Sequence, residues 1–421
     1  MYQLDVAALR GLFAARVRPG VRPVIVRTVW LLGAVSCFTD ISSEMVSSIL
    51  PAYLFLHLQL SPVQFGLIDG LYQGVTALAR LASGMAADRW RQYKLIATIG
   101  YGVSAICKLG LLAAGSAWGL FAAIISADRV GKGIRTAPRD ALISLTTGRQ
   151  HLASAFGVHR AMDTIGVLVG PLLAYAILTF VPGRYDAVFV LSFAIALIGI
   201  GVLTLLVENR RDADDNLTST AHLPIARLLR DRDFRTITIA ATAMSFVVVS
   251  DAFLYLLVQW RRSGGPETIP LLYVGTASAY LAFAAPLGRW ADRVGRVRVF
   301  LMGQIFMIAV YAGLGWLTLD LWVVVLCLVL HGAYYAATDG VLAALVSGIT
   351  RTEVRASGLA ALTTATSLAR LCGSIVVGAI WSWRGPHAVV LLALSGTVVS
   401  LIWSVIALSR IPTTALETYE A

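Results

Sequence analysis

The sequence predicts an all-α integral membrane protein built from two similar six-helix bundles, on three observations. Of its 421 residues, 58% are hydrophobic and only 14% are charged, well below the roughly 25% charged residues of a soluble domain. Apolar stretches long enough to cross a bilayer, which needs roughly 20 residues, recur along the whole chain. One phrase occurs twice between such stretches, as Gly84-Met-Ala-Ala-Asp88-Arg89 and as Gly288-Arg-Trp-Ala-Asp292-Arg293. An internal repeat of this kind inside a membrane is typical of alternating-access carriers.

Twelve spanning helices are predicted, six on each side of one polar interruption. The first six are expected over residues 28–57, 62–87, 93–115, 118–145, 153–181 and 185–207. The second six are expected over residues 235–260, 268–289, 297–317, 321–349, 355–383 and 387–409. The chain thus divides into an N-terminal bundle (1–207), a linker (208–234) and a C-terminal bundle (235–421). Within the linker, residues 223–229 have the pattern of a short amphipathic helix lying on the membrane surface.

The distribution of basic residues predicts the orientation in the membrane. The net charge is +11, but the basic residues flank the predicted helices, so a lipid bilayer and not a nucleic acid is the expected partner. With the N-terminus inside, the outer loops hold four basic residues, Arg184, Arg261, Arg262 and Arg384. By the positive-inside rule both termini are expected in the cytoplasm, with the protein in a bacterial inner membrane. The four cysteines are isolated and the six histidines are scattered, so no disulfide framework, metal site or cofactor is predicted.

The repeated phrase resembles motif A of the major facilitator superfamily, in the loops after the second and eighth predicted helices. The second copy continues as Val294-Gly295-Arg296, like the family pattern, whereas the first has Arg91 where the family has Gly. In that family the Asp of the motif meets a helix N-terminus, where the helix dipole stabilises a carboxylate, and an Arg of the other half. The resemblance implies a gating role for Gly84, Asp88, Arg89, Gly288, Asp292 and Arg293. A basic loop that only sets topology is the alternative, and two copies in register argue against it.

Two further likenesses to this superfamily lie in the fourth and fifth predicted helices. Asp128-Arg129-Val-Gly131-Lys132-Gly133 resembles motif B, whose Arg is tied to proton coupling. Gly166-x-x-x-Gly170-Pro171 resembles motif C of drug and metabolite antiporters, although Ala174-Tyr175 replaces the usual Gly pair. Glycines four apart also let two helices approach closely and a proline bends a helix. Ordinary packing is therefore the alternative to a gating role for Gly166, Gly170 and Pro171.

Two segments, Asp40-Ile-Ser-Ser-Glu44-Met45 and Gly131-Lys-Gly-Ile-Arg-Thr-Ala-Pro-Arg-Asp140, together resemble one prokaryotic twelve-helix branch of the superfamily. The resemblance covers the whole chain and implies the major facilitator fold, with two pseudo-symmetric bundles. It implies little about the transported solute.

Ionisable residues inside the predicted helices indicate where a polar path runs, because such groups are costly in a bilayer and face a bundle interior or a water-filled cavity. In the N-terminal bundle polar residues recur at helical spacing on single helix faces. The members expected to line a substrate cavity are Asp69, Arg80, Lys132, Arg135 and Arg160. Static ion pairs that hold the bundle together are the alternative, and for Arg135 and Arg139 so is anchoring at the membrane interface.

The C-terminal bundle has fewer charges in its predicted helices. Its expected cavity residues are Asp251, Tyr255, Tyr335, Asp339 and Arg370, and the last two are expected to form an ion pair between helices. Aromatic and hydroxyl groups with few charges suit an amphipathic organic molecule. A tyrosine stripe also arises from plain helix packing.

Asp40 and Glu44 are the first candidates for a proton-binding site. They lie one turn apart on one helix face, without a cation in their own helix turn. Partial desolvation and mutual repulsion then favour a proton on one of them.

The other candidates for proton coupling lie next to basic residues. They are Asp128, Arg129 and Asp163. Arg129, Lys132 and Arg160 are expected to neutralise the two carboxylates, and Lys108 is expected to pair with Asp69.

These observations together predict a secondary active transporter. No Walker A loop, nucleophilic triad signature or Cys/His cluster is found, so an enzyme is not expected. The protein is expected to act as a monomer that moves a small organic solute by alternating access, through proton-coupled efflux as motif C suggests. One alternative is proton-coupled uptake of an organic anion at Arg129, Lys132, Arg135 and Arg139. Another is a membrane sensor that has the fold but does not transport.

Overall fold

A computed structural model describes residues 26–90, 92–147, 151–208, 230–262, 264–350 and 355–409, without the side chains of residues 80–90, 153, 355 and 356. Every regular element of this part is helical. The N-terminal half comprises α2 (Arg27–Pro51), the π-helix η1 (Ala52–His57), α3 (Pro62–Trp90), α4 (Tyr93–Ala113), α5 (Trp118–Thr146), α6 (Leu152–Phe180) and α7 (Tyr185–Leu206). The C-terminal half comprises α9 (Arg232–Val247), α10 (Asp251–Arg262), the 3-10 helix η3 (Pro266–Thr268), α11 (Ile269–Val294), α12 (Arg296–Trp316), α13 (Leu321–Ile349), α14 (Arg355–Arg384) and α15 (Pro386–Leu408). The predicted surface helix at 223–229 lies outside the described residues.

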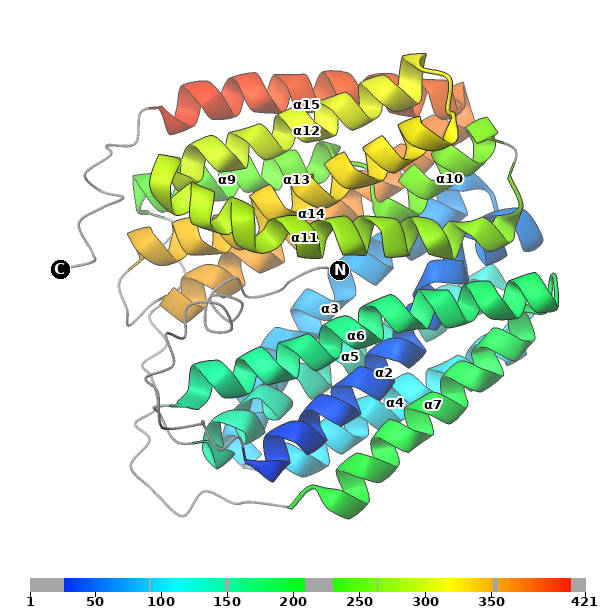
Figure 1. The fold of residues 1–421 in the computed structure, drawn as a ribbon, viewed down its shortest axis with the longest axis vertical. Helices are drawn as coiled ribbons and strands as arrows, with labels where there is room; N and C mark the ends of the chain where they lie inside the picture. The colour runs from blue at the N-terminus through cyan, green and yellow to red at the C-terminus, as the bar shows by residue number, and fades with distance from the viewer. Residues whose placement is uncertain are drawn as a thin grey trace.

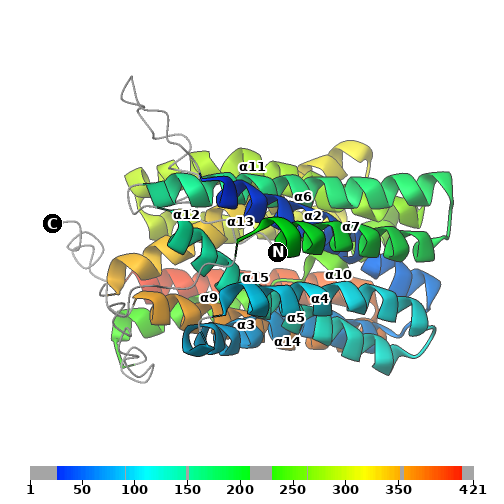
Figure 2. The same cartoon turned by 90° about the horizontal axis from the view of Figure 1, so that it is seen from below.

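The helices form two bundles, the N-terminal one in the lower part of Figure 1 and the C-terminal one in the upper part. In Figure 1 and Figure 2 the long helices run roughly along one common direction, as they do when a bundle spans a bilayer. Ten described spans are long and apolar enough to cross a membrane. The two remaining long helices, α3 and α5, are more polar because they carry the charged faces recognised in the sequence. The prediction of an all-α twelve-helix fold is confirmed.

The first and seventh predicted helices differ from simple rods. The first continues from α2 into the π-helix η1, and the seventh is interrupted between α9 and α10. At the interruption Val248 has extended backbone angles, and the Tyr311 hydroxyl lies 2.8 Å from the backbone N–H of Val249, which donates to it. Three consecutive valines occupy residues 247–249, and β-branched side chains weaken helix propensity. The break places Asp251 in the first turn of α10, where a carboxylate is favoured by the helix dipole.

Glycines let the two halves touch closely along α3 and α14. Gly66, Gly70 and Gly74 lie four residues apart on α3. A Cβ atom added at Gly66 would lie 2.5 Å from the Ser374 carbonyl oxygen, and one at Gly70 would lie 2.7 Å from that of Leu371. The two backbones therefore approach directly, which side chains on both helices would prevent.

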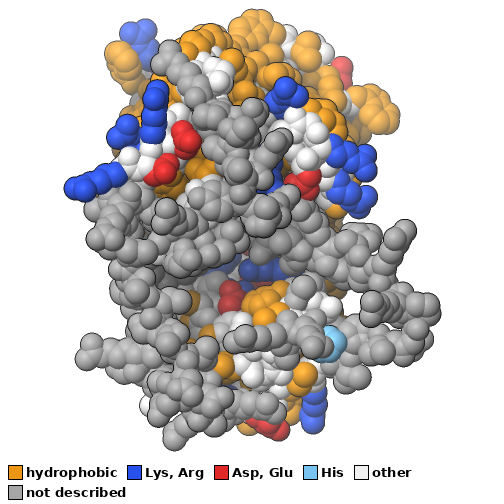
Figure 3. Space-filling model, turned by 90° about the vertical axis from the view of Figure 1, so that its left-hand side faces the viewer, with side chains coloured by type: hydrophobic (Ala, Val, Ile, Leu, Met, Phe, Trp, Pro, Cys, Tyr) orange, Lys and Arg blue, Asp and Glu red, His pale blue; other side chains and the backbone are white. Residues whose placement is uncertain are grey.

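The two ends of the molecule differ. We call the end where the linker joins α7 and α9 the linker end, and the end with the loops after η1, α10 and α14 the far end. At the far end four aromatic rings from both halves meet, which we call the far gate. Their ring-centroid separations are 4.8 Å for Phe65–Phe253, 5.5 Å for Phe55–Trp381 and 5.8 Å for Phe253–Trp381. Figure 3 looks onto the linker end and shows a hollow between the halves, with basic and acidic side chains visible inside it.

Candidate functional site

A central cavity of about 180 Å³ lies between the two halves. Residues of α2, α3, α5 and α6 line it on one side, and residues of α11 and α14 on the other. Three carboxylates line this cavity: Asp40, Glu44 and Asp163. Six cations line it as well: Arg129, Lys132, Arg135, Arg139, Arg160 and Arg370. Three of these cations pair with carboxylates that lie outside the lining: Arg129 with Asp128, Arg139 with Asp140 and Arg370 with Asp339.

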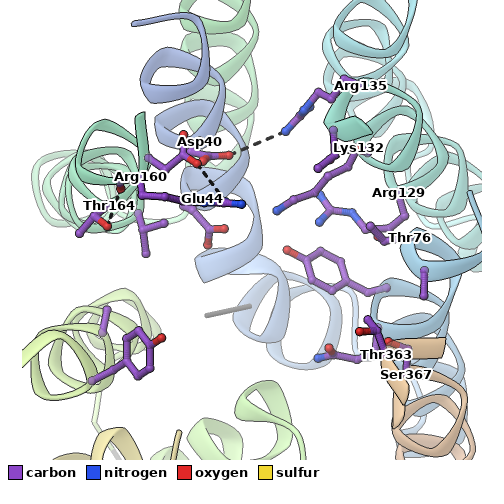
Figure 4. Close-up of a pocket in the computed structure, with 18 of the residues that line it drawn as sticks. Asp40, Glu44, Thr76, Arg129, Lys132, Arg135, Arg160, Thr164, Thr363 and Ser367 are labelled. Atoms are coloured by element: carbon purple, nitrogen blue, oxygen red, sulfur yellow. Dashed lines mark hydrogen bonds and ion pairs between the residues drawn. The ribbon is translucent and has the colours of Figure 1, made fainter. Parts of the chain in front are cut away.

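Four of the six cations come from one face of α5, because Arg129, Lys132, Arg135 and Arg139 follow each other at helical steps of three and four. Figure 4 shows the first three of them facing Asp40 and Glu44 of α2 across the cavity. A Cβ atom at Gly131 would lie 2.8 Å from the carbonyl oxygen of Gly100. The glycines of the motif B-like segment thus seat α5 directly on α4, which turns the cationic face toward the cavity.

Three of these cations are held by neighbouring side chains. Arg129 pairs with Asp128 and lies 4.0 Å above the ring centroid of Tyr72. Arg135 donates a hydrogen bond of 3.0 Å to Ser104 Oγ, and Arg139 donates one of 3.0 Å to Ser36 Oγ. Arg135 and Arg139 are also almost fully buried, so the alternative of anchoring at the membrane interface does not describe them.

Lys132 is the exception on this face. Among the described residues no carboxylate lies within 4.0 Å of its Nζ atom. Lys132 therefore does not form the ion pair with Asp128 or Asp163 that was expected. The carboxylates that act on it electrostatically are Asp40 and Glu44. Its ammonium group is therefore free to meet an anion in the cavity.

The two first candidates for proton binding have different surroundings. Asp40 has no cation in its own helix turn, but its Oδ1 atom lies 3.8 Å from Nη2 of Arg135 on α5. Sequence reasoning missed this contact because the arginine comes from another helix. Glu44 is 2% exposed and accepts a hydrogen bond of 2.7 Å from Ser47 Oγ. Among the described residues Glu44 has no Lys or Arg within 4.0 Å.

The other two coupling candidates are paired, largely as expected. Asp163 lies 3.4 Å from Arg160 and 3.9 Å from Arg139. Asp128 pairs with Arg129 and lies 3.5 Å from Lys108 Nζ. The predicted Lys108–Asp69 pair is therefore wrong, because α4 packs against α5 and brings Lys108 to Asp128 instead.

The motif C-like glycines pack α6 against α2 within the N-terminal half. A Cβ atom at Gly166 would lie 2.9 Å from Cβ of Asp40, and one at Gly170 would lie 2.9 Å from Cβ of Glu44. The prediction that these glycines let two helices approach is confirmed. Pro171 follows inside α6 without ending the helix. The contact holds both candidate carboxylates at the cavity wall, opposite α5.

The C-terminal half lines the cavity with Ala277, Tyr280, Leu281, Thr363, Ser367 and Arg370. The predicted Asp339–Arg370 pair is confirmed at 3.4 Å. Asp339 itself is not among the lining residues and instead orients the arginine.

Four further expected cavity residues lie elsewhere. The Tyr255 hydroxyl donates a hydrogen bond of 2.7 Å to Thr276 Oγ1, and the Tyr335 hydroxyl donates one of 2.6 Å to Asp251. Asp69 and Asp251 line a smaller pocket toward the far end. Helical spacing identified these residues as inward-facing but carries no information about depth along the path.

Tyr72 lines the central cavity and was not identified from the sequence. The available signal was its position one turn from Asp69 and beside Gln73, within a polar helix face.

The second motif A-like loop is tied within its own half. Asp292 Oδ1 lies 3.5 Å from Arg296 Nη2, and Arg296 donates a hydrogen bond of 3.1 Å to the Ala344 carbonyl of α13. Gly288 is buried in α11, whereas Arg293 is exposed. The side chains of Arg80, Gly84, Asp88 and Arg89 lie outside the described residues.

Comparison with known proteins agrees with this architecture. The family model of the Major Facilitator Superfamily matches residues 32–265 and 261–419. The chain belongs to the major facilitator superfamily. This membership confirms the resemblance inferred from motifs A, B and C, and it makes the chain a multi-pass membrane transporter of that superfamily.

Relatives within the superfamily cover different shares of the chain. An uncharacterised MFS-type transporter of Methanocaldococcus jannaschii is 28% identical over 367 residues, which are 84% of this chain and 88% of that protein. The multidrug resistance protein MdtH of Yersinia pestis is 26% identical over 234 residues, 54% of this chain and 55% of its own. The crystal structure of the nucleoside transporter NupG has a TM-score of 0.75 at 14% identity, covering 92% of this chain and 100% of that chain. At this identity the similarity to NupG shows the fold alone.

Proposed function

We propose that this major facilitator superfamily member is a proton-coupled secondary transporter of a small organic anion. The observation that carries the proposal is the composition of the central cavity wall. Six cations face three carboxylates there, and Lys132 has no ion-pair partner among the described residues. A cation without a counter-ion at the wall of a cavity attracts an anion and disfavours a second cation.

The anion is bound by Lys132, with the anchored guanidinium groups of Arg129 and Arg135 beside it. Because those two groups are held by neighbouring side chains, little conformational entropy is lost when they contact a ligand. On the opposite wall, Tyr280 and Leu281 offer apolar surface, and Thr363 and Ser367 offer hydroxyl groups. This combination suits a molecule that has an acidic group at one end and an organic body at the other.

Glu44 is the proposed proton-binding residue. It is the buried cavity carboxylate that lacks a Lys or Arg within 4.0 Å in the described part of the chain. An anion bound at Lys132 adds negative charge next to Glu44, and a proton on Glu44 compensates that charge. Anion and proton binding then favour each other, and this coupling is reciprocal. Such coupling supports symport, in which the anion and the proton leave the cavity on the same side.

Alternating access follows from the two ends of the molecule. The cavity opens at the linker end, which we place in the cytoplasm of a bacterial inner membrane together with both termini. The far gate closes the opposite side through Phe55, Phe65, Phe253 and Trp381. Transport requires the far gate and the α3–α14 contact to separate while the linker end closes. Cysteine accessibility at positions near Arg91, Asp215 and Arg296 tests the orientation, and labelling of these sites from outside the cell would overturn it.

The experiment begins with a panel of organic mono- and dicarboxylates and phosphate esters added to purified protein. Binding is measured as thermal stabilisation, since a ligand at a hundred times its Kd adds about 2.7 kcal/mol. We expect Lys132→Gln to weaken binding of the best compound by at least about tenfold, which corresponds to roughly 1.4 kcal/mol. Lys94→Gln is the matched control, because Lys94 lies outside the cavity and donates hydrogen bonds to the backbone carbonyls of Thr204 and Val207. Equal binding by both variants contradicts the anion site.

Coupling is then measured in proteoliposomes with the same compound. We expect Glu44→Gln to abolish accumulation driven by a pH gradient while solute exchange continues, because exchange needs no net proton movement. Asp40→Asn is expected to retain part of the accumulation. Full pH-driven accumulation in Glu44→Gln would place the coupling residue elsewhere, at Asp163 or Asp128.

Proton-coupled efflux is the second candidate function. The motif C-like Gly166-x-x-x-Gly170-Pro171 and the similarity to MdtH over about half of the chain favour it. The direction of accumulation in a pH gradient distinguishes anion symport from efflux by antiport, because symport accumulates solute on the alkaline side and antiport on the acidic side. Absence of any counterflow with a compound that binds would instead support a sensor without transport.

A further inference from the structure

A second, smaller pocket lies between the central cavity and the far gate. Tyr72 and Gln73 line both this pocket and the central cavity, and Phe65 of the far gate closes its other side. Its wall combines residues of α2, α3 and η1 with Asp251, Ala252 and Tyr273 of the C-terminal half.

Two buried carboxylates from opposite halves face this pocket. Asp69 of α3 is 7% exposed and accepts a hydrogen bond of 2.6 Å from Ser374 Oγ of α14. Asp251, in the first turn of α10, is 6% exposed and accepts a hydrogen bond of 2.6 Å from the Tyr335 hydroxyl. Within the described residues neither has a Lys or Arg within 4.0 Å. Buried charges without a counter-ion cost several kcal/mol each, so this pocket requires some other source of positive charge.

A buried histidine next to Asp251 indicates what that source is. His331 of α13 has no exposed surface, and its Nε2 atom lies 3.4 Å from Asp251 Oδ1. Neither ring nitrogen makes a hydrogen bond within the described part of the chain. Buried polar atoms are rarely left without a hydrogen-bond partner. A proton shared by the imidazole ring and the carboxylate would convert the contact into a charge-assisted hydrogen bond.

The other groups facing these residues do not neutralise them. Tyrosine hydroxyls, which are neutral near pH 7, come from α3, α10, α11, α12 and α13, namely Tyr72, Tyr255, Tyr273, Tyr311, Tyr334 and Tyr335.

Two arginines act on the cluster from a distance, and both are engaged. Arg370 of α14 acts on Asp251 but pairs with Asp339 at 3.4 Å. Arg129 of α5 lies against Tyr72 and pairs with Asp128. Without a bound proton the pocket therefore carries net negative charge.

We infer that Asp69, Asp251 and His331 form a second proton-binding site, distinct from Glu44 and loaded from the far side. The inference rests on the alternating access of the proposed function. Asp69 belongs to the N-terminal half, whereas Asp251 and Ser374 belong to the C-terminal half, so opening of the far gate separates them and admits water. Water stabilises the ionised carboxylates in the open state, and closure buries them again. Proton uptake at this site therefore favours the state in which the far gate is closed.

The test measures the far-end separation in the absence of any solute. Spin labels are attached at Ser116→Cys and Thr318→Cys, which lie in exposed far-end loops of the two halves, in full-length protein whose four native cysteines are replaced by alanine. The protein is placed in lipid nanodiscs, and pulsed electron paramagnetic resonance gives the distance distribution at pH 5.5 and pH 8.5. We expect the ratio of short to long distances to fall at least about tenfold at the higher pH, since one linked proton changes it by up to roughly tenfold per pH unit.

Variants assign the response to this site. We expect Asp69→Asn/Asp251→Asn to keep the short distance at both pH values, with less than about a twofold change in the ratio, because the neutral amides mimic the protonated state. His331→Gln keeps both carboxylates, and we expect it to move the midpoint of the pH-dependent distance change to lower pH. Asp186→Asn, which removes an exposed far-end carboxylate, is the matched control and should respond like the wild type.

Three results would overturn the inference: an unchanged response in Asp69→Asn/Asp251→Asn, an unchanged midpoint in His331→Gln, or loss of the response in Glu44→Gln alone. Because no solute is present, a failure to transport organic anions would refute the proposed function and leave this measurement valid. Retention of the response in Glu44→Gln would show that the second site acts separately from the central one.

Discussion

The two halves of this molecule share an architecture and a repeated loop phrase, yet they contribute differently to the cavity. The N-terminal half supplies five of the six cavity cations and all three cavity carboxylates, whereas the C-terminal half supplies Arg370 and uncharged side chains. The difference shows that an internal repeat specifies helix lengths, loops and packing, while the polar side chains on the inner faces diverge. In this carrier the N-terminal half holds eight of the nine charged residues of the cavity wall, and the C-terminal half forms the opposite wall.

The fourth helix of each half illustrates this divergence. α5 presents Lys132 together with Arg129, Arg135 and Arg139, and residues of α2, α3 and α4 hold the three arginines. Its counterpart α13 presents His331, Tyr334 and Tyr335, which pack among other aromatic rings. Close packing through glycine occurs in both halves, at Gly170 on α6 and at Gly332 on α13. The two halves therefore share close helix packing through glycine, but they do not share the cationic face of the fourth helix.

The largest expected effect concerns the buried ion pairs of the two halves. Asp128→Asn leaves two almost fully buried cations, Lys108 and Arg129, without their counter-ion, which we expect to cost about 3–5 kcal/mol of stability. Asp339→Asn leaves one cation, Arg370, whose side chain is 26% exposed, and we expect a smaller loss. The stability losses of the two variants are measured by thermal unfolding and by the yield of purified protein. The double variant Asp128→Asn/Lys108→Met should recover part of the loss, and equal losses in the two single variants would contradict the contrast between the halves.

Glycine substitutions test the packing that both halves share. A Cβ atom at Gly170 would lie 2.6 Å from the Ile41 carbonyl oxygen, and one at Gly332 would lie 2.6 Å from the Tyr280 backbone nitrogen. We expect Gly170→Ala and Gly332→Ala each to lower the unfolding free energy by about 1–3 kcal/mol. Gly102→Ala is the control, because no atom lies within 4 Å of its added Cβ, and we expect a gain of up to about 1 kcal/mol.

Transport measurements separate the two tight glycines further. Gly170 contacts Glu44, so Gly170→Ala is also expected to slow proton-coupled transport more than Gly332→Ala does. Equal transport by both would show that the α2–α6 contact only holds the helices together.

The smallest expected effect on stability concerns the two motif A-like loops. The Asp292–Arg296 pair is partly exposed, and such pairs contribute about 0–1 kcal/mol, so Asp292→Asn should unfold at nearly the wild-type temperature. We expect Asp88→Asn and Asp292→Asn each to slow turnover in proteoliposomes, because closure of the linker end is weakened. Wild-type rates in both variants would refute the gating role of the repeated phrase.

The amino-acid sequence by itself determined the twelve helices, the two bundles and the identity of most charged residues in the cavity. The physical reason is that a bilayer requires about 20 apolar residues per span and forces ionisable side chains to face inward. The Arg160–Asp163 pair was also predictable, because residues three apart on one helix meet wherever that helix lies.

Only the tertiary structure decided which charges remain without a partner. The Asp40–Arg135 and Lys108–Asp128 contacts join different helices, so they depend on helix rotation and on the close approaches at Gly131, Gly166 and Gly170. These contacts leave Lys132 and Glu44 as the unpaired cation and carboxylate of the cavity within the described residues. Likewise, the break before Asp251 and the α3–α14 contact place Asp69 and Asp251 in one pocket beneath the far gate. Helical periodicity gives the face of a residue, whereas depth and partners across helices follow from how the helices pack.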